Sequence, residues 1–336
     1  MSAGLRSSLS WPLLGGGKTS HFDQLCSTEQ LFATWDKFAR GKHGKADVQS
    51  FKRQLEKNIF ELQAELLADE YQHGKYEPFI VHDPKRRQIH KADVRDRVVH
   101  QAVFDVTEPF FEKQFIFDSF SCRKGKGTHA GVRRLRQHLS RASRNNSRPV
   151  FALKCDVKQF FANVEHAKLL NLLSISVTDE KVLELLEGII NSFYISPGQG
   201  IPLGNVTSQL FANVYMHQLD WFVKHNLHEE HYIRYCDDFV IISSSRQHLL
   251  DLITPIEEFL AAELNLKLHP SKVVIRSWIQ GIDFLGYIIK PHCTLLRTKT
   301  KHRILMRADS KSISSYLGVL SHADSYELRQ ILLSKL

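Results

Sequence analysis

The segment 232–243 constrains the fold of this chain more than any other. It consists of two short runs rich in Tyr, Ile, Phe and Val that flank two adjacent acids, Asp237 and Asp238. Runs of this composition on either side of two turn-forming residues are typical of a β-hairpin, here with both acids at its turn. Aspartate favours turns for conformational reasons alone, so the hairpin by itself indicates structure rather than activity.

A third acid indicates that this hairpin has a chemical role. Residues 151–157 form another apolar run, and Asp156 stands near its end. If the strands are neighbours, three carboxylates meet at adjacent strand ends. Such an oxygen-rich, acidic site suits hard divalent cations, above all Mg²⁺, with Mn²⁺ as a substitute. The backbone carbonyl of Val157 can supply another oxygen, and this is the ligand chemistry of two-metal phosphoryl transfer.

Five motifs, in their order and spacing, resemble the motif series of reverse transcriptases. They are Asp156 with Phe160 and Phe161, the segment QGIPLGNVTSQLFANVYMHQLD at 199–220, Tyr235-Cys236-Asp237-Asp238, Leu268-His269-Pro270-Ser271-Lys272, and Phe284-Leu285-Gly286-Tyr287. The resemblance extends from near Leu31 to about residue 325. It implies an α+β right-hand polymerase with fingers, a palm that contains an antiparallel sheet, and a short helical thumb. It also implies an RNA-directed DNA polymerase that uses two Mg²⁺ ions and the catalytic acids Asp156, Asp237 and Asp238.

Hydrophobic periodicity adds a domain plan. We expect a leader and helical extension over residues 1–75, fingers and palm over 76–290, and a short helical thumb over 291–336. Apolar residues recur at intervals of three and four over 28–69, which predicts two amphipathic helices joined by the basic turn 40–45. Further helices are predicted at 94–111, 182–195, 207–221 and 249–264.

Two cationic segments are implied to form the nucleotide site. Residues 77–91 predict a hairpin around Asp83-Pro84-Lys85, and in reverse transcriptases the equivalent hairpin clamps the triphosphate. Lys85 and Arg87 are then the expected phosphate ligands, with a solvated basic turn as the alternative. A Gly-rich, cationic loop farther along the chain contains Arg123, which the resemblance brings to the incoming nucleotide and the template.

Further roles also come from the family. An aromatic ring at the offset of Phe161 blocks a ribose 2′-hydroxyl and selects deoxynucleotides. The alternative is a core aromatic, because Phe160 and Phe161 point to opposite faces of an extended segment. Lys272 is expected near the leaving pyrophosphate, as a general acid, a phosphate contact or a surface residue. The primer-gripping turn is expected at Phe284, Leu285 and Gly286.

Gln209 indicates the subfamily. Most reverse transcriptases of bacterial introns and retrons carry Ser-Pro at this point, whereas LGNVTSQ at 203–209 resembles the version in diversity-generating retroelements. Those elements copy a template RNA with errors at adenines and use the product to rewrite a target gene. The implied partners are the template RNA, a DNA or RNA primer, deoxynucleoside triphosphates and a small basic accessory protein. The alternatives are a defence-associated or retron-like reverse transcriptase and a non-catalytic RNA-binding derivative, which would be expected to have lost its acids.

Composition favours a polyanionic partner. The chain of 336 residues carries 45 Lys and Arg against 36 Asp and Glu, a net charge of +9, which suits nucleic acid. The five cysteines are odd in number and widely spaced, so we expect reduced thiols in a cytoplasmic protein. No apolar run reaches the length of a membrane span.

Overall fold

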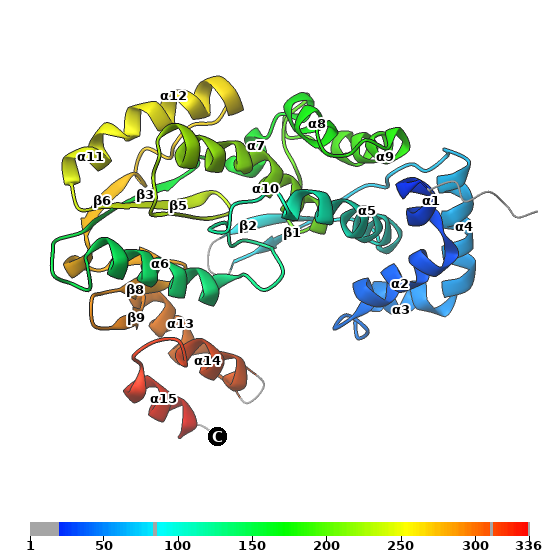
Figure 1. Ribbon diagram of the computed structural model, residues 1–336. Helices are drawn as coiled ribbons and strands as arrows, with labels where there is room; N and C mark the ends of the chain where they lie inside the picture. Colours follow the sequence, from blue (N-terminus) through cyan, green and yellow to red (C-terminus); the bar gives the residue numbers. More distant parts are fainter. Residues whose placement is uncertain (1–19, 83–85, 310–311, 335–336) are drawn as a thin grey trace, which may run out of the picture.

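The computed structural model describes residues 20–82, 86–309 and 312–334. Its central sheet is antiparallel and consists of β3 (Phe151–Asp156), β4 (Tyr232–Tyr235), β5 (Asp238–Ser243) and β6 (Val274–Ser277), in the order β4-β5-β3-β6. The predicted hairpin at 232–243 is therefore confirmed. Figure 1 shows helices on both faces of this sheet, with the N-terminal helices to one side and the C-terminal helices below. The class is α+β, as predicted.

The central sheet separates two hydrophobic cores because its side chains alternate between faces. Leu153 and Cys155 face one core, together with α10 (Val206–Trp221), α11 (Arg246–Asp251) and α12 (Ile253–Leu264). Ala152 and Ile242 face the other core, together with α6 (Thr128–Ala142). The single helix predicted at 249–264 is thus two helices. Both faces of the sheet therefore carry packed helices.

A small antiparallel sheet connects this body to the C-terminal helices. Its strands are β7 (Ile282–Phe284), β8 (Tyr287–Ile289) and β9 (Thr294–Leu296), which share a core with α6. Because β9 continues the sheet to Leu296, the expected boundary at residue 290 crosses a sheet rather than a linker. The helices α13 (Thr298–Arg307), α14 (Ile313–Leu320) and α15 (Tyr326–Leu333) follow.

The N-terminal extension is helical. It contains α1 (His21–Cys26), α2 (Thr28–Ala39), α3 (Ala46–Arg53) and α4 (Leu55–Leu67). The periodicity over 28–69 predicts two helices, and the structure has three there. The cause is Gln54, whose backbone leaves the helical region at φ −127° and ψ 40°. The basic turn 40–45 lies between α2 and α3, as predicted.

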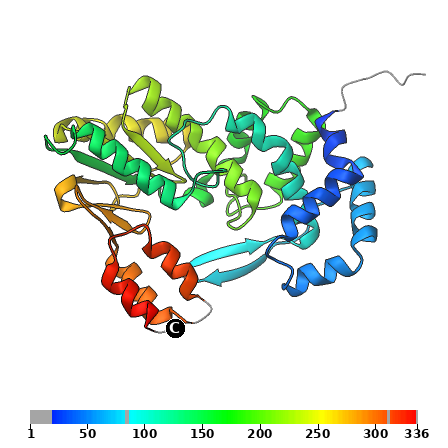
Figure 2. The same cartoon turned by 60° about the horizontal axis from the view of Figure 1, so that its bottom comes forward.

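The predicted fingers hairpin is present, with strands β1 (Glu77–Val81) and β2 (Arg87–Lys91). In Figure 2 it extends from the side of the N-terminal helices toward the C-terminal helices. The helix predicted at 94–111 is α5 (Val94–Glu112), and α7 (Phe160–Asn163), α8 (His166–Ser174) and α9 (Glu180–Asn191) complete the helical part. The last of these ends at Asn191, before its predicted end at 195, and the amide of Ile195 donates to the carbonyl of Gln199 instead of continuing the helix.

Membrane insertion was not expected from the sequence. Within the three described ranges, no helix combines the length and the apolar character that crossing a bilayer requires.

Candidate active site

The three acids meet at one end of the central sheet. Asp156 on β3 lies directly opposite Asp238 on β5. Tyr235 pairs with Asp238, so Cys236 and Asp237 form the two-residue turn of the hairpin. The amide of Val157 donates to the carbonyl of Asp237 at 3.1 Å, which ties this turn to the neighbouring strand. The end of β3 and the turn of the β4–β5 hairpin thus lie together, as their motifs predict.

Two lysines neutralise two of these carboxylates. The Nζ atom of Lys272 lies 2.6 Å from Oδ1 of Asp156, and the Nζ atom of Lys154 lies 3.0 Å from Oδ2 of Asp238. The other carboxylate oxygen of Asp238, Oδ1, is buried and has no hydrogen-bond partner. Cations are therefore favoured at this strand end, and one acceptor is left unsatisfied.

Burial and crowding oppose the charge on this acid pair. Burial raises the pKa of Asp237, and the nearby carboxyl of Asp156 adds to the effect. Burial also raises the pKa of Asp238 to about 6, with further contributions from Asp156 and Asp237, against the lowering effect of Lys154. Like charges in a low-dielectric site destabilise each other. The ionised site gains stability from any added cation.

The donor chemistry of this site fits Mg²⁺. The residues that would hold it are Asp156, Asp237 and Asp238, all with hard oxygen ligands, and the orphaned Oδ1 of Asp238 supplies an acceptor ready for a cation. Over the described ranges, no three His, Cys, Asp or Glu side chains are arranged around one shared point. Instead, the ammonium group of Lys154 lies against Asp238 and that of Lys272 against Asp156.

A cleft of about 480 Å³ opens on this acid end. It joins three parts of the chain: strand β2 of the fingers hairpin, the central sheet and the start of the C-terminal helical region. The charged residues in its lining are Arg87, Lys154, Asp156, Asp238, Lys272, Arg276, Asp283, Arg297 and Arg303. Cations thus surround the acids, an arrangement suited to a substrate with several phosphates.

The two expected phosphate ligands of the hairpin have different outcomes. Arg87 stands at the start of β2 and lines the same cleft as Asp156 and Asp238. Lys85 falls outside the described residues. The hairpin therefore contributes at least one guanidinium to the cleft that the acids also line.

Arg123 differs from the expectation that it contacts the nucleotide. Its Nε and Nη2 atoms donate to the Glu112 carboxylate at 2.8 and 2.7 Å, and Nη1 donates to the carbonyls of Ile116 and Ser119. The side chain is 6% exposed. These donors therefore bond within the protein. Arg123 holds together the loop from which it was expected to reach the nucleotide.

Phe161 does not lie on an extended segment, which corrects the reason given for its orientation. Gln159 has a left-handed backbone (φ 49°), after which α7 begins. Phe160 is buried and Phe161 is half-buried, with their rings edge to face at 5.2 Å. Phe160 is therefore the core ring of the two, and Phe161 packs partly against the same core.

Gln209 and the residues expected to grip the primer lie on different elements of the fold. Gln209 is exposed on the first turn of α10. The loop before it packs against the fingers hairpin, since the amide of His90 donates to the Leu203 carbonyl at 3.0 Å. Leu285 and Gly286, with φ of 50° and 92°, form the turn between β7 and β8 and line the cleft. Phe284 is buried beneath them, so it supports this turn rather than contacting a substrate directly.

Lys154 is the contact that our sequence reasoning missed. It precedes Asp156 by two positions on a strand, so both side chains point to the same face. This spacing was enough to predict a cation beside the acids.

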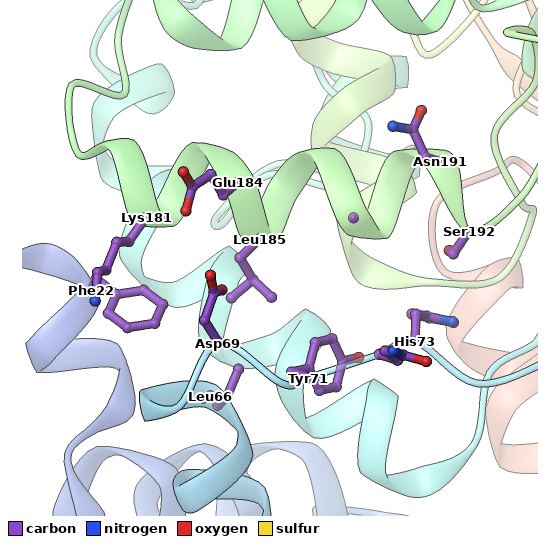
Figure 3. Close-up of a pocket in the computed structure, with 12 residues that line it drawn as sticks. Phe22, Leu66, Asp69, Tyr71, His73, Lys181, Glu184, Leu185, Asn191 and Ser192 are labelled. Carbon is purple, nitrogen blue, oxygen red and sulfur yellow. The ribbon is translucent and has the colours of Figure 1, made fainter.

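A second cavity, of about 350 Å³, lies away from this site. It is formed by α9, Phe22 of α1 and the segment that follows α4 (Figure 3), and none of the three acids lines it. Its lining mixes Lys181, Glu184 and Asp69 with the rings of Tyr71 and His73.

Known proteins resemble this chain in sequence and in fold. Residues 82–289 match the family described as reverse transcriptase (RNA-dependent DNA polymerase). Protein YkfC of Escherichia coli K12 is 24% identical over 271 residues, covering 67% of this chain and 71% of YkfC. The group II intron-encoded protein LtrA of Lactococcus lactis is 22% identical over 274 residues, covering 61% of this chain and 45% of LtrA. Telomerase from Candida albicans, solved with a fragment of telomeric RNA, superposes with a TM-score of 0.53 at 11% identity, covering 80% of this chain and 56% of that one.

The fold, with its acid-ended antiparallel sheet, is that of a right-hand polymerase. The chain belongs to the reverse transcriptase family, whose members are RNA-directed DNA polymerases. It spans less than half the length of LtrA and about half of the telomerase chain.

Proposed function

We propose that this chain copies an RNA template into DNA at the carboxylates of Asp156, Asp237 and Asp238. The observation that carries the proposal is the pairing of Asp156 with Asp238 at the edge of a cleft with cationic walls. Two Mg²⁺ ions held by these carboxylates and the Val157 carbonyl would supply charge neutralisation and Lewis-acid activation for nucleotidyl transfer.

The chain's own cations have roles in this proposal. The ammonium group of Lys272 lies 2.6 Å from Asp156, beside the carboxylate at which the pyrophosphate would leave. There it would either donate a proton to the pyrophosphate or neutralise its charge. Arg87 would bind the triphosphate from the fingers side, together with Lys85. Phe161 would form the wall beside the sugar, and the turn at Leu285 and Gly286 would contact the primer.

Primer extension on an RNA template tests this proposal. Asp237→Asn removes one carboxylate charge without opening a cavity, so we expect DNA synthesis to fall by about three orders of magnitude with little change in folding or RNA affinity. Asp105→Asn is the matched control, because it removes a carboxylate that is paired with Lys37 and does not line the cleft. Substantial synthesis by purified Asp237→Asn would refute the assignment of the site.

We further propose that the enzyme belongs to a diversity-generating retroelement. Support comes from Gln209 in the LGNVTSQ segment, exposed on the first turn of α10 beside a loop that packs on the fingers hairpin. An exposed amide there would face the nascent base pair and could relax its geometric check. The template RNA and a small basic accessory protein would then help to hold the duplex.

The error spectrum of the cDNA tests this finer proposal. With its cognate RNA and accessory protein, the enzyme should make errors mainly opposite template adenines. A pair of near repeats that differ at adenines should also lie beside the gene. Errors spread evenly over the four template bases would leave the polymerase intact and remove the retroelement assignment.

A further inference from the structure

Arg234 occupies the best-satisfied polar site beneath the catalytic turn. It lies on β4, and both its side chain and its main partner, Asp220 of α10, are 0% exposed. Nε and Nη2 donate to the two oxygens of Asp220 at 2.7 and 2.6 Å. Nη2 also donates to Ser119 Oγ at 3.1 Å, and Nη1 to Asn213 Oδ1 at 3.3 Å. Four of the five guanidinium N–H groups are thus fixed by buried partners.

The fifth N–H reaches the catalytic turn. Nη1 of Arg234 donates to the backbone carbonyl of Cys236 at 3.0 Å. That carbonyl belongs to the peptide unit that joins Cys236 to Asp237. The next peptide is held from the other side, since the Val157 amide donates to the carbonyl of Asp237. Both peptide planes that flank Asp237 are therefore fixed, one by a side chain and one by the neighbouring strand.

This turn needs such support because its conformation is unfavourable. Cys236 has a φ of 58°, a left-handed value at a position where two-residue hairpins normally place glycine. A non-glycine residue there is strained and persists only when its surroundings determine its conformation. Without the bond from Arg234, the peptide between Cys236 and Asp237 has less to hold it in place.

Stability alone does not account for this ion pair. Burying two opposite charges is expensive, and apolar residues of similar volume often fold as well or better. An apolar pair cannot, however, donate a hydrogen bond to the Cys236 carbonyl. The distinctive contribution of Arg234 is therefore geometric.

We propose that Arg234 is a positioning residue, which Asp220 orients so that its guanidinium fixes the peptide carrying Asp237 in the geometry needed for metal binding and catalysis. This inference rests on the proposed function of the acid end. Arg234 is buried and does not touch the substrate, so its effect should appear in kcat and in metal affinity rather than in the KM for nucleotide.

The test removes both charges together. Arg234→Met combined with Asp220→Asn leaves no unpaired charge in the core, and Tyr232→Phe is the matched control. The control deletes another buried hydrogen bond to Asp220, from a hydroxyl at 2.7 Å that does not contact the turn. We expect the double variant to lose about 100-fold in kcat, the cost of a small misplacement of a reacting group, with KM and primer–template affinity within threefold of wild type. The control should keep kcat within threefold.

Arg234→Lys separates charge from geometry. A lysine can neutralise Asp220, but its donors radiate from one atom and cannot span both oxygens of Asp220 and the Cys236 carbonyl. We expect wild-type-like unfolding with kcat still reduced at least about tenfold. Because this variant keeps the ion pair, it decides the question if the double variant does not fold. Full recovery of kcat by lysine would assign Arg234 a charge-pairing role only and overturn the proposal.

Metal affinity gives a readout that needs no turnover. Titration of Mn²⁺ followed by electron paramagnetic resonance should show at least fivefold weaker binding in Arg234→Lys than in wild type or Tyr232→Phe. Equal affinity in the folded variants would overturn the positioning role. A wild-type chain that binds Mn²⁺ but never polymerises would instead refute the proposed function and leave this inference standing.

Discussion

The acid end of the central sheet and the loop 112–127 handle their charges in opposite ways. At the acid end, Asp238 keeps one buried oxygen unpaired, and its pKa is raised by burial and by its acidic neighbours. In the loop, Glu112 and two backbone carbonyls accept four hydrogen bonds from the guanidinium of Arg123. Charge left in conflict is typical of a functional site, and charge that is satisfied internally is typical of a structural tie. The type of a charged residue alone therefore does not show whether it binds a ligand or stabilises the fold.

Asp238→Asn gives the largest expected effect on this comparison. DNA synthesis should fall by about three orders of magnitude, while the metal-free protein becomes more stable by about 3 kcal/mol at pH 7. The pKa of Asp238 is raised from 3.8 to about 6, so the folded state binds the proton more tightly than the unfolded state. The stability that this proton provides is fully present below pH 3.8 and is lost by pH 7. Asparagine removes this loss. Chemical denaturation in a chelator, compared with primer extension, measures both changes.

Mg²⁺ provides the control for that result. It should raise the unfolding free energy of wild type, because it binds the folded acid end, and should have a much smaller effect on Asp238→Asn. A variant that is less stable than wild type without metal would show that the acid end is not in electrostatic conflict.

Arg87→Ala should act on substrate use. Since Arg87 lines the cleft opposite the acids, we expect the KM for deoxynucleotides to rise about tenfold, with unchanged unfolding. The neighbouring Arg86, which is exposed and does not line the cleft, is the matched control. An unchanged KM for Arg87→Ala would return the hairpin to the solvated basic turn.

Arg123→Ala should lower stability and leave the KM for nucleotide almost unchanged. Loss of its guanidinium leaves Glu112 and two carbonyls without their donor, so the unfolding free energy should fall by about 2 kcal/mol, a value reduced for the partial exposure of Glu112. The KM for nucleotide should stay within about twofold of wild type. A tenfold rise in KM with normal stability would restore the nucleotide role that the sequence suggested.

Phe161→Ala should change selectivity more than stability. Removing the half-buried ring opens the wall beside the sugar, so the ratio of ribonucleotide to deoxynucleotide incorporation should rise several-fold. Phe160→Ala should instead cost about 3 kcal/mol of stability, because that ring is buried, and leave the ratio unchanged. Competition assays with mixed nucleotides distinguish the two outcomes, and a reversed pattern would exchange the two roles.

Local patterns were sufficient to predict the acid end. Turn chemistry located the hairpin, and strand alternation could also have linked Lys154 to Asp156. The tie at Arg123 was not predictable in this way, because it depends on how the loop after Glu112 folds back over eleven residues. The helical turn at Phe160 was not predicted either, because Gln159 takes a left-handed conformation that its residue type does not favour.

The smallest expected effect concerns a buried group that must stay neutral, in contrast to Asp238. The ring of His100 contacts Nε2 of His73 at 2.9 Å and Thr207 Oγ1 at 2.9 Å. Burial, with added effects from His73 and Arg97, lowers the pKa of His100 to about 3. The unfolded chain binds this proton from about pH 6.5 downward and the folded chain does not. Acid therefore destabilises the fold through His100, whereas it stabilises the fold through Asp238. Between pH 7 and pH 5.5, the wild-type chain should lose about 1 kcal/mol more unfolding free energy than His100→Gln does, and the exposed control His43→Gln should lose as much as wild type. If His100→Gln leaves the loss unchanged, the proton enters elsewhere and His100 is not the group that opposes acid.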